Sequence, residues 1–211
     1  MINQEKATAY YDRFSKVYDL ISSKRYYHQP RKYAIEQLEL QKHQTILNLP
    51  CGTGQNFSYF QNNLAETGQI IGIDLSDGML KKAEQKVKKN NWQNIKIIKG
   101  DATKIDATWI KDHFGELKID AVLCDLGLSG FPQWKQVIDN LITILEPNGK
   151  IVIMDWYIEK PSLRGKFINW IGKGEVNRPI WQYLETQISD FHINHSFKGG
   201  DVFVASGRKS P

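Results

Sequence analysis

The chain has 211 residues, 41% of them hydrophobic, with 28 basic and 23 acidic residues and a formal net charge of +5. This length suits one domain with a sizeable buried core, and no stretch approaches the roughly 18 apolar residues of a membrane-spanning helix. The two cysteines lack paired spacing and the first residues lack the apolar region of a signal peptide, so we expect a reducing, cytoplasmic compartment without a disulfide framework.

The excess positive charge lies at the two ends of the chain. Residues 41–155 hold 13 basic and 13 acidic residues, residues 1–40 hold 7 and 5, and residues 156–211 hold 8 and 5. Basic flanks favour an anionic acceptor or a position on the inner face of an anionic membrane, and ordinary solubility charge is the simpler explanation.

Residues 1–40 are expected to form a helical segment ahead of the core. Aromatic and aliphatic residues recur there at helical spacing: Tyr10, Tyr11, Phe14, Val17, Tyr18 and Ile21. Such a stripe usually packs on the edge of a sheet. If the segment also covers a site, Tyr11 and Tyr18 are the residues that we expect to face it.

A strand, a glycine turn and a second strand follow. The apolar run 45–49 leads into Pro50-Cys51-Gly52-Thr53-Gly54, residues 56–63 read as a helix, and the strand 69–73 ends at Asp74. Glycines let a turn approach a ligand closely, and an acid at the end of the second strand can bond a ribose. Taken alone, the glycines also fit an ordinary turn and Asp74 a helix cap. The ordered set predicts a nucleoside cofactor site.

The turn does not fit a dinucleotide or a triphosphate. A dinucleotide turn has glycines spaced G-x-G-x-x-G, whereas Gln55 and Asn56 follow Gly54 here and no third glycine comes after them. No lysine follows the turn as it does in a triphosphate-binding loop.

The next helix, residues 76–90, carries a run of lysines that suggests nucleic acid. Met79, Leu80, Ala83 and Val87 provide its buried stripe, and the lysines fall mainly on the other side: Lys81, Lys82, Lys86, Lys88 and Lys89. We therefore interpret the run as a solvated helix face.

The remaining elements complete an alternating pattern. Strands are predicted at 95–99, 119–124 and 150–155, with a helix over 132–145 between the last two. Residues 191–197 and 202–206 read as two strands joined by a short turn, so one of them must run antiparallel to the rest. Strands that alternate with helices predict an α/β doubly wound sheet of seven strands.

This series, with Gly100-Asp101-Ala102 after the third strand, resembles the class I methyltransferases that use S-adenosylmethionine, over residues 10–208. The resemblance implies a seven-stranded Rossmann-like sheet with an antiparallel last strand. It implies that Cys51, Gly52 and Gly54 border the methionine part of the cofactor. The full set of implied cofactor contacts is Tyr18, Asn48, Pro50, Cys51, Gly52, Gly54, Asp74, Leu75, Met79, Asp101, Ala102 and Asp125.

Within that set, the resemblance implies that Asp74 takes the ribose hydroxyls, that Met79 packs near the adenine, and that Asp101 bonds the adenine amine. Ala102 would supply a nearby backbone N–H. The chain departs from the family at Asn48, where the family usually has an acid at the end of the first strand. An amide still donates and accepts hydrogen bonds, but it carries no charge.

Outside the core, the run 11–19 resembles the N-terminal lid of ubiquinone and menaquinone methyltransferases, in which Tyr18 matches a lid tyrosine. The runs 181–185 and 199–205 resemble that group and the related bacterial phospholipid N-methyltransferases. We expect one domain, residues 1–211. Its parts are a helical lid (1–40), a cofactor-binding core (41–155), an acceptor cap (156–188) and a C-terminal hairpin (189–211).

The chemistry needs few protein groups. Methyl transfer from a sulfonium is an in-line displacement, positioning alone can contribute about 7–11 kcal/mol, and a base is required only if the acceptor loses a proton. Asp125, Tyr18 and Tyr157 are the candidate catalytic residues. Further candidates at the acceptor side are Asp155, Trp156, His28 and Arg178. No His or Cys cluster has metal-ligand spacing, so no metal is expected.

The acceptor is predicted to be a small molecule or a lipid. Residues 125–128 replace the Asn/Asp-Pro-Pro-aromatic signature of enzymes that methylate exocyclic base or glutamine amines, which disfavours nucleic-acid and protein-glutamine acceptors. We favour the amine head group of a phospholipid. The alternatives are a quinol ring carbon, a soluble metabolite, and a non-catalytic cofactor-binding partner subunit. The oligomeric state is left open.

Overall fold

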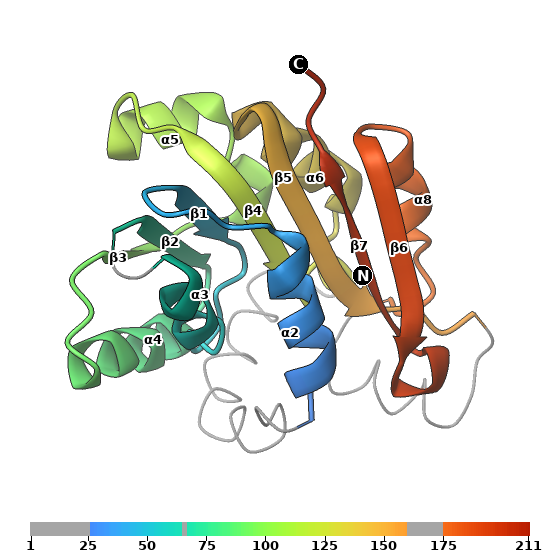
Figure 1. Ribbon diagram of the computed structural model, residues 1–211, viewed down its shortest axis with the longest axis horizontal. Helices are drawn as coiled ribbons and strands as arrows, with labels where there is room; N and C mark the ends of the chain where they lie inside the picture. The colour runs from blue at the N-terminus through green and yellow to red at the C-terminus, as the bar shows by residue number, and fades with distance from the viewer. Residues whose placement is uncertain (1–25, 65–66, 160–174) are drawn as a thin grey trace.

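The computed structural model describes residues 26–64, 67–159 and 175–211 (Figure 1). Tyr18 and the rest of the aromatic stripe of the expected lid lie outside these ranges, as does the middle of the expected acceptor cap. The described part of residues 1–40 contains one helix, α2 (His28–Gln37).

Seven strands form one sheet in the order β3-β2-β1-β4-β5-β7-β6. Their bounds are β1 Thr45–Asn48, β2 Gln69–Asp74, β3 Ile95–Lys99, β4 Ile119–Asp125, β5 Leu145–Trp156, β6 Ser189–Phe197 and β7 Val202–Arg208. Strands β1 to β5 pair in parallel, and β7 runs antiparallel to β5 and β6. The predicted seven-stranded doubly wound sheet with an antiparallel last strand is therefore confirmed.

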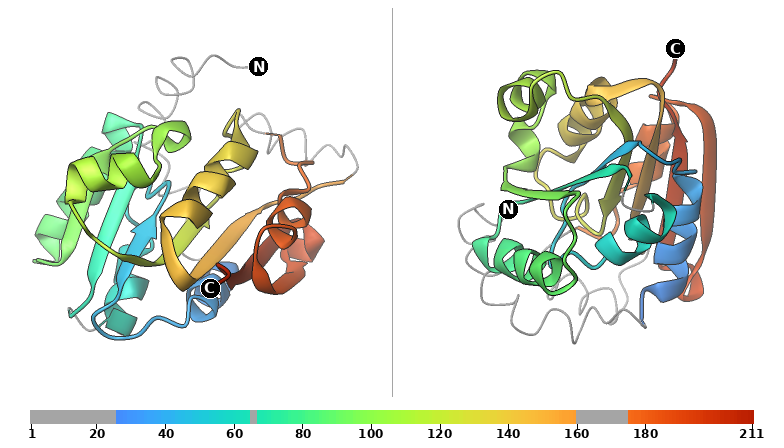
Figure 2. Two further views of the ribbon diagram at one scale, coloured as in Figure 1. Left: turned by 90° about the horizontal axis from the view of Figure 1, so that it is seen from above. Right: turned by 60° about the vertical axis from the view of Figure 1, so that its left-hand side comes forward.

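Helices cover both faces of the sheet (Figure 2). One layer consists of α2, α3 (Phe57–Leu64) and α4 (Asp77–Lys89), and the other of α5 (Ala107–Phe114), α6 (Trp134–Ile144) and α8 (Ile180–Glu185). Because successive strand residues point to opposite faces, Ile46 joins the core under the first layer and Leu47 the core under the second. No helix among the described residues is long and apolar enough to cross a membrane.

Local capping explains where two of these helices begin. The Ser76 side chain accepts a hydrogen bond from the Met79 backbone N–H at 3.2 Å and starts α4. Asp106 does the same for the Trp109 N–H at 2.8 Å and starts α5. We did not predict α5 from the sequence, although Asp106 is the capping residue type that could have indicated it.

Strand β5 is longer than predicted. It spans Leu145–Trp156, whereas the sequence pattern predicts the end of a helix at Leu145, then a turn, and a strand only over 150–155. Leu145 already pairs with Ile119, and the register then shifts before Lys150 pairs with Ala121. Asn148 has a φ of 63°, so the expected turn is present as an irregularity inside the strand pairing.

The C-terminal end of α2 is fixed to the sheet by an ion cluster. Glu39 accepts from the buried Lys150 ammonium of β5 at 2.9 Å and also pairs with Arg208 of β7. These contacts lower the pKa of Glu39, with the hydrogen bond from Lys150 as the largest cause. The helix thus crosses β5 and β7, and its first turns lie over the carboxyl ends of the central strands (Figure 1).

Candidate active site

The strand order reverses between β1 and β4, and open α/β sheets bind ligands at the carboxyl ends of the strands at such a reversal. The glycine turn leaves β1 at this point. Gly52 and Gly54 have φ values of +52° and +71°, and a Cβ at Gly54 would lie 2.6 Å from the Phe57 ring. Gly54 is therefore required both by its left-handed backbone and by the closeness of α3.

Asp74 joins the end of β2 to this turn. One carboxylate oxygen, Oδ2, accepts from the Gly52 N–H at 2.9 Å, and the other, Oδ1, accepts from the Ser76 N–H at 3.0 Å. A carboxylate offers two acceptor oxygens side by side, which is the pattern that suits a pair of ribose hydroxyls. The helix cap of α4 is Ser76 and not Asp74. The ribose assignment itself stays a prediction.

The predicted adenine side lies at the ends of β2 and β3. Asp101 caps a short 3-10 turn, Ala102–Lys104, because its Oδ1 accepts from the Thr103 N–H at 3.0 Å and the Thr103 hydroxyl at 2.8 Å. Met79 and Ala102 are buried, and Leu75 is half-buried. These residues lie at or just after the ends of β2 and β3, and their contacts with an adenine remain predictions.

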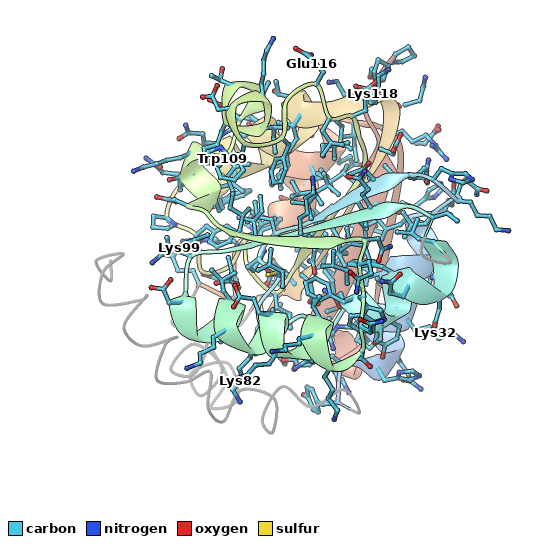
Figure 3. The ribbon with its side chains drawn as sticks, turned by 90° about the vertical axis from the view of Figure 1, so that its left-hand side faces the viewer. Lys32, Lys82, Lys99, Trp109, Glu116 and Lys118 are labelled. Carbon is cyan, nitrogen blue, oxygen red and sulfur yellow. The ribbon has the colours of Figure 1, made fainter. Side chains whose placement is uncertain are left out.

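Lys86 does not belong to the solvated face on which we placed it. Its ammonium donates to the Thr53 carbonyl of the glycine turn at 2.7 Å. Its neighbour Lys82, in contrast, extends from α4 away from the sheet (Figure 3). The signal was available, since Lys86 follows the buried Met79 and Ala83 at seven and three residues, which is the spacing of the inward stripe.

Asp125, at the end of β4, forms a buried ion pair that the sequence did not predict. Arg31 of α2 donates to Asp125 Oδ2 from Nε at 3.2 Å and from Nη2 at 3.1 Å. Its Nη1 donates to Gln55 Oε1 of the glycine turn at 3.0 Å. Arg31 lies three and four residues before the buried Ala34 and Ile35, so all three share one face of the helix. A basic residue on this buried face was the available signal.

Asn48 has an amide-specific role. Its Nδ2 donates to the carbonyls of Leu123 and Pro50 at 3.3 and 3.4 Å, while its Oδ1 accepts from Asn56 Nδ2 at 3.2 Å. A carboxylate could not donate to the two carbonyls. The departure from the family's usual acid is therefore explained by the hydrogen bonds that this position makes.

Asp155 and Arg178 hold the loop that follows β4. The buried Asp155 carboxylate accepts from the backbone N–H groups of Ser129 and Trp156 at 2.9 and 2.7 Å. Burial raises the pKa of Asp155 from its usual 3.8 to about 6, although these N–H groups lower it. Arg178 donates to the Leu128 and Phe131 carbonyls. Both predicted acceptor-side residues thus bind the protein's own loop.

The other candidates at this end make aromatic contacts. The Tyr157 ring packs edge-on against Trp181 with centroids 4.3 Å apart, and Trp156 contacts Tyr27 in the same manner at 6.1 Å. His28 shares a hydrogen bond with the Tyr59 hydroxyl at 2.8 Å. These contacts leave the catalytic prediction for Tyr157 untested, and Tyr18 lies outside the described residues.

Neither cysteine has the environment of a reactive nucleophile. Cys51 and Cys124 are both free and buried, and burial raises the pKa of each thiol well above its usual value. Within the described ranges, no group of three or more His, Cys, Asp and Glu side chains could hold a metal ion.

The family of methyltransferase domains matches residues 40–186, which span the glycine turn, Asp74, Asp101 and Asp125. The chain belongs to this family. The chain is 29% identical over 161 residues to the demethylmenaquinone methyltransferase of Geobacillus sp. (strain WCH70), an alignment that covers 76% of this chain and 63% of the relative. It therefore spans slightly less than two thirds of that relative's length.

A second relative, the demethylmenaquinone methyltransferase of Desulfitobacterium hafniense (strain Y51), is 25% identical over 212 residues, covering 85% of this chain and 79% of the relative. The fold of the chain matches solved structures, among them the following two. One is the putative methyltransferase in complex with the Haloferax volcanii Trm112 activator, with a TM-score of 0.72 and 12% identity over 95% of this chain and 98% of that one.

The other is the Haemonchus contortus phosphoethanolamine N-methyltransferase 2 in complex with S-adenosyl-L-methionine. Its TM-score is 0.69 and its identity 13%, over 87% of this chain and 53% of that one. The family match and these neighbours support S-adenosylmethionine as the cofactor. The residues fit it, since the turn brings Gly52 against the buried carboxylate of Asp74, and two buried acceptor oxygens close to the turn have no donor among the described residues.

Proposed function

We propose that this chain transfers a methyl group from S-adenosylmethionine to the amine head group of a lipid. The observation that carries the proposal is the carboxylate of Asp125. It is buried at the strand reversal, and its Oδ1 has no hydrogen-bond donor among the described residues. A carboxylate oxygen in that position suits an amine, which presents N–H groups and is cationic at neutral pH.

Bound S-adenosylmethionine supplies an electrophilic methyl group together with its leaving group. The residues of this chain then have three tasks. Asp125 holds the amine and can accept the proton that the nitrogen must lose before it attacks. The glycine turn, Asp74 and Lys86 fix the position from which the methyl group is presented. Asp155 and Arg178 hold the loop after β4, whose movement would misplace Asp125.

The edge of the site supports a lipid over a soluble amine. Tyr26, just before α2, is the one exposed large hydrophobic residue among those described, with 38% of its surface accessible. The Lys198 ammonium of the turn between β6 and β7 lies 3.9 Å from the centroid of its ring. Tyrosine and lysine both have an apolar body and a polar tip, which suits the boundary between head groups and water.

A quinol ring carbon is the second candidate acceptor. The observation that favours it is the name shared by the curated relatives, demethylmenaquinone methyltransferase. In that reaction the same Asp125 oxygen would accept the proton of a ring hydroxyl, which activates the adjacent carbon. The two acceptors therefore use one protein group and differ in the atom that receives the methyl group.

A direct assay separates the candidates. The purified protein is incubated with radiolabelled S-adenosylmethionine and vesicles that contain either phosphatidylethanolamine or demethylmenaquinol, followed by organic extraction. We expect label in the phospholipid, released into water when the head group is hydrolysed, and lost in the variant Asp125→Asn. Label in the quinol alone would establish the second candidate. Label in neither vesicle, but in soluble metabolites of a cell extract, would reject a lipid acceptor.

A further inference from the structure

A buried polar cluster lies where α2, the glycine turn and β4 meet. Its members are Arg31, Asn48, Gln55, Asn56 and Asp125, and each is more than nine tenths buried. Burying an ion pair seldom stabilises a fold relative to apolar packing, because both charges lose their hydration. The arrangement of the hydrogen bonds, rather than stability, therefore indicates what the cluster does.

Three donors converge on one oxygen of Asp125. Arg31 donates to Oδ2 through Nε and Nη2, and Asn56 donates to it through Nδ2 at 3.0 Å. The planar guanidinium presents its N–H groups in a fixed fork, which sets the rotation of the carboxylate. As a result Oδ1 is turned away from the fork, and it has no donor within the described part of the chain.

The amide of Asn56 is oriented just as firmly. Its Nδ2 lies 3.2 Å from Asn48 Oδ1 and 3.0 Å from Asp125 Oδ2, and both of these atoms are acceptors. A flipped amide would place oxygen against oxygen, so the nitrogen must occupy this position. Asn56 Oδ1 is then the second buried acceptor without a donor among the described residues.

The two acceptors belong to one small region. Asn56 Oδ1 shares its carbon with Asn56 Nδ2, and Asp125 Oδ1 shares its carbon with Asp125 Oδ2. The atoms Asn56 Nδ2 and Asp125 Oδ2 form a 3.0 Å hydrogen bond with each other. Buried acceptors cost free energy unless a donor reaches them. A ligand that satisfies both must offer at least two hydrogens, as an ammonium or amine does. A carboxylate or phosphate offers only oxygens and would be repelled.

We propose that Arg31 is a positioning residue that holds Asp125 and Asn56 as a binding site for an amine. Two sources of that amine are available. One is the amino group of the amino-acid part of S-adenosylmethionine. The other is the head-group amine of the acceptor, and this second source rests on the proposed function. In both cases the guanidinium acts through Asp125 and does not itself touch the ligand.

The first arm of the test compares two ligands that share adenosine and a thioether: S-adenosylhomocysteine, which has the amino-acid part, and 5′-methylthioadenosine, which lacks it. For a cofactor amine, Arg31→Gln weakens S-adenosylhomocysteine binding by about 10-fold or more in calorimetry and leaves 5′-methylthioadenosine unchanged. Arg31→Lys restores part of the loss, because it keeps the charge without the fork. Loss of fold would weaken both ligands equally and would contradict the proposal.

The second arm tests the acceptor amine. If that is the source, both adenosine ligands keep their affinity in Arg31→Gln, and the KM for phosphatidylethanolamine vesicles rises by about 10-fold with a smaller change in kcat. Asp125→Asn provides an isosteric check. The Arg31 guanidinium keeps the remaining oxygen at the position of Oδ2, so the new NH₂ group takes the position of Oδ1 and replaces an acceptor by a donor. Asp125→Asn should change the same quantity as Arg31→Gln does, either the affinity for S-adenosylhomocysteine or the KM for the vesicles.

The control is Lys32→Gln, which removes a charge from the next residue of α2. Lys32 is 63% exposed and pairs with Glu36, so both ligand affinities and the KM should stay at wild-type values. If Arg31→Gln also changes none of the three quantities, Arg31 is a structural contact only and the proposal is wrong. The ligand comparison contains no acceptor, so it is independent of whether the lipid-amine function is correct.

Discussion

Asp74 is the residue on which we expect the cofactor site to depend most. It is 8% exposed, and it holds the N–H groups of Gly52 and Ser76 on its two oxygens. We expect Asp74→Ala to weaken S-adenosylhomocysteine binding by about 10- to 100-fold, because buried hydrogen bonds to a charged group are lost. Isothermal titration calorimetry measures this. Asp77→Ala, which removes an exposed acid at the start of the same helix, should bind normally. Unchanged affinity in Asp74→Ala would refute the ribose assignment.

Residues whose chemistry is local were predictable from the sequence. Gly52, Gly54 and Asp74 belong to one strand-turn-helix unit and the strand that follows it, so their spacing already indicates a cofactor site. Arg31 and Lys86 were not recognised, because each bonds to a partner far along the chain. The Arg31–Asp125 contact spans 94 residues and the Lys86–Thr53 contact 33. Only the folded sheet brings such pairs together.

At the scale of the elements, Asp155 holds the loop after β4, and we expect it to make the stability of the fold depend on pH. The raised pKa of about 6 means that, between its usual 3.8 and about 6, the unfolded state loses this proton before the folded state does. Stability therefore falls as pH rises through this window. Above pH 6 the free energy of unfolding is lower by the full amount, about 3 kcal/mol.

Urea unfolding of wild type and Asp155→Asn between pH 4 and pH 7 tests this expectation. The variant loses an acceptor for Ser129 or Trp156 at every pH, but it cannot titrate. Wild type should therefore lose stability relative to the variant as the pH rises. Asp112→Asn, which changes an exposed acid on α5, provides a control for general charge effects. A wild-type advantage that grows with pH would contradict the assigned cause.

The strands were predicted more completely than the helices and turns. The inner strands are marked by continuous apolar runs, whereas the edge strands β3 and β6 alternate half-buried and exposed residues and are marked by their place between turns. Helix α5 was missed because Ile110 is its one buried side chain, which leaves almost no periodic signal. The early start of β5 was missed because Pro147, Asn148 and Gly149 are typical of a turn. In the structure they form an irregular pairing that long-range contacts impose.

At the scale of the whole molecule, the two ends of the sheet differ in what they present. Lys118 precedes β4 and lies at the end opposite to the site, where its side chain is 76% exposed and pairs with Glu146 (Figure 3). Lys198 lies just before β7, whose first residue pairs with Trp156 at the carboxyl end of β5, so it lies at the same end of the sheet as Asp125 and beside the exposed Tyr26. If the acceptor is a lipid, the site end should face the membrane and Lys198 should contribute to binding.

Charge reversal at these two lysines tests that orientation. We expect Lys198→Glu to weaken co-sedimentation with vesicles containing anionic lipid by about 5- to 30-fold at low ionic strength, because each unit of charge near such a surface contributes about 1 kcal/mol and the reversal changes the charge by two units. Added salt should shrink the difference by screening. Lys118→Glu makes the same change in net charge and should bind as wild type does. Equal losses in both variants would show that net charge alone governs the association, and absence of wild-type binding would contradict a membrane-bound acceptor.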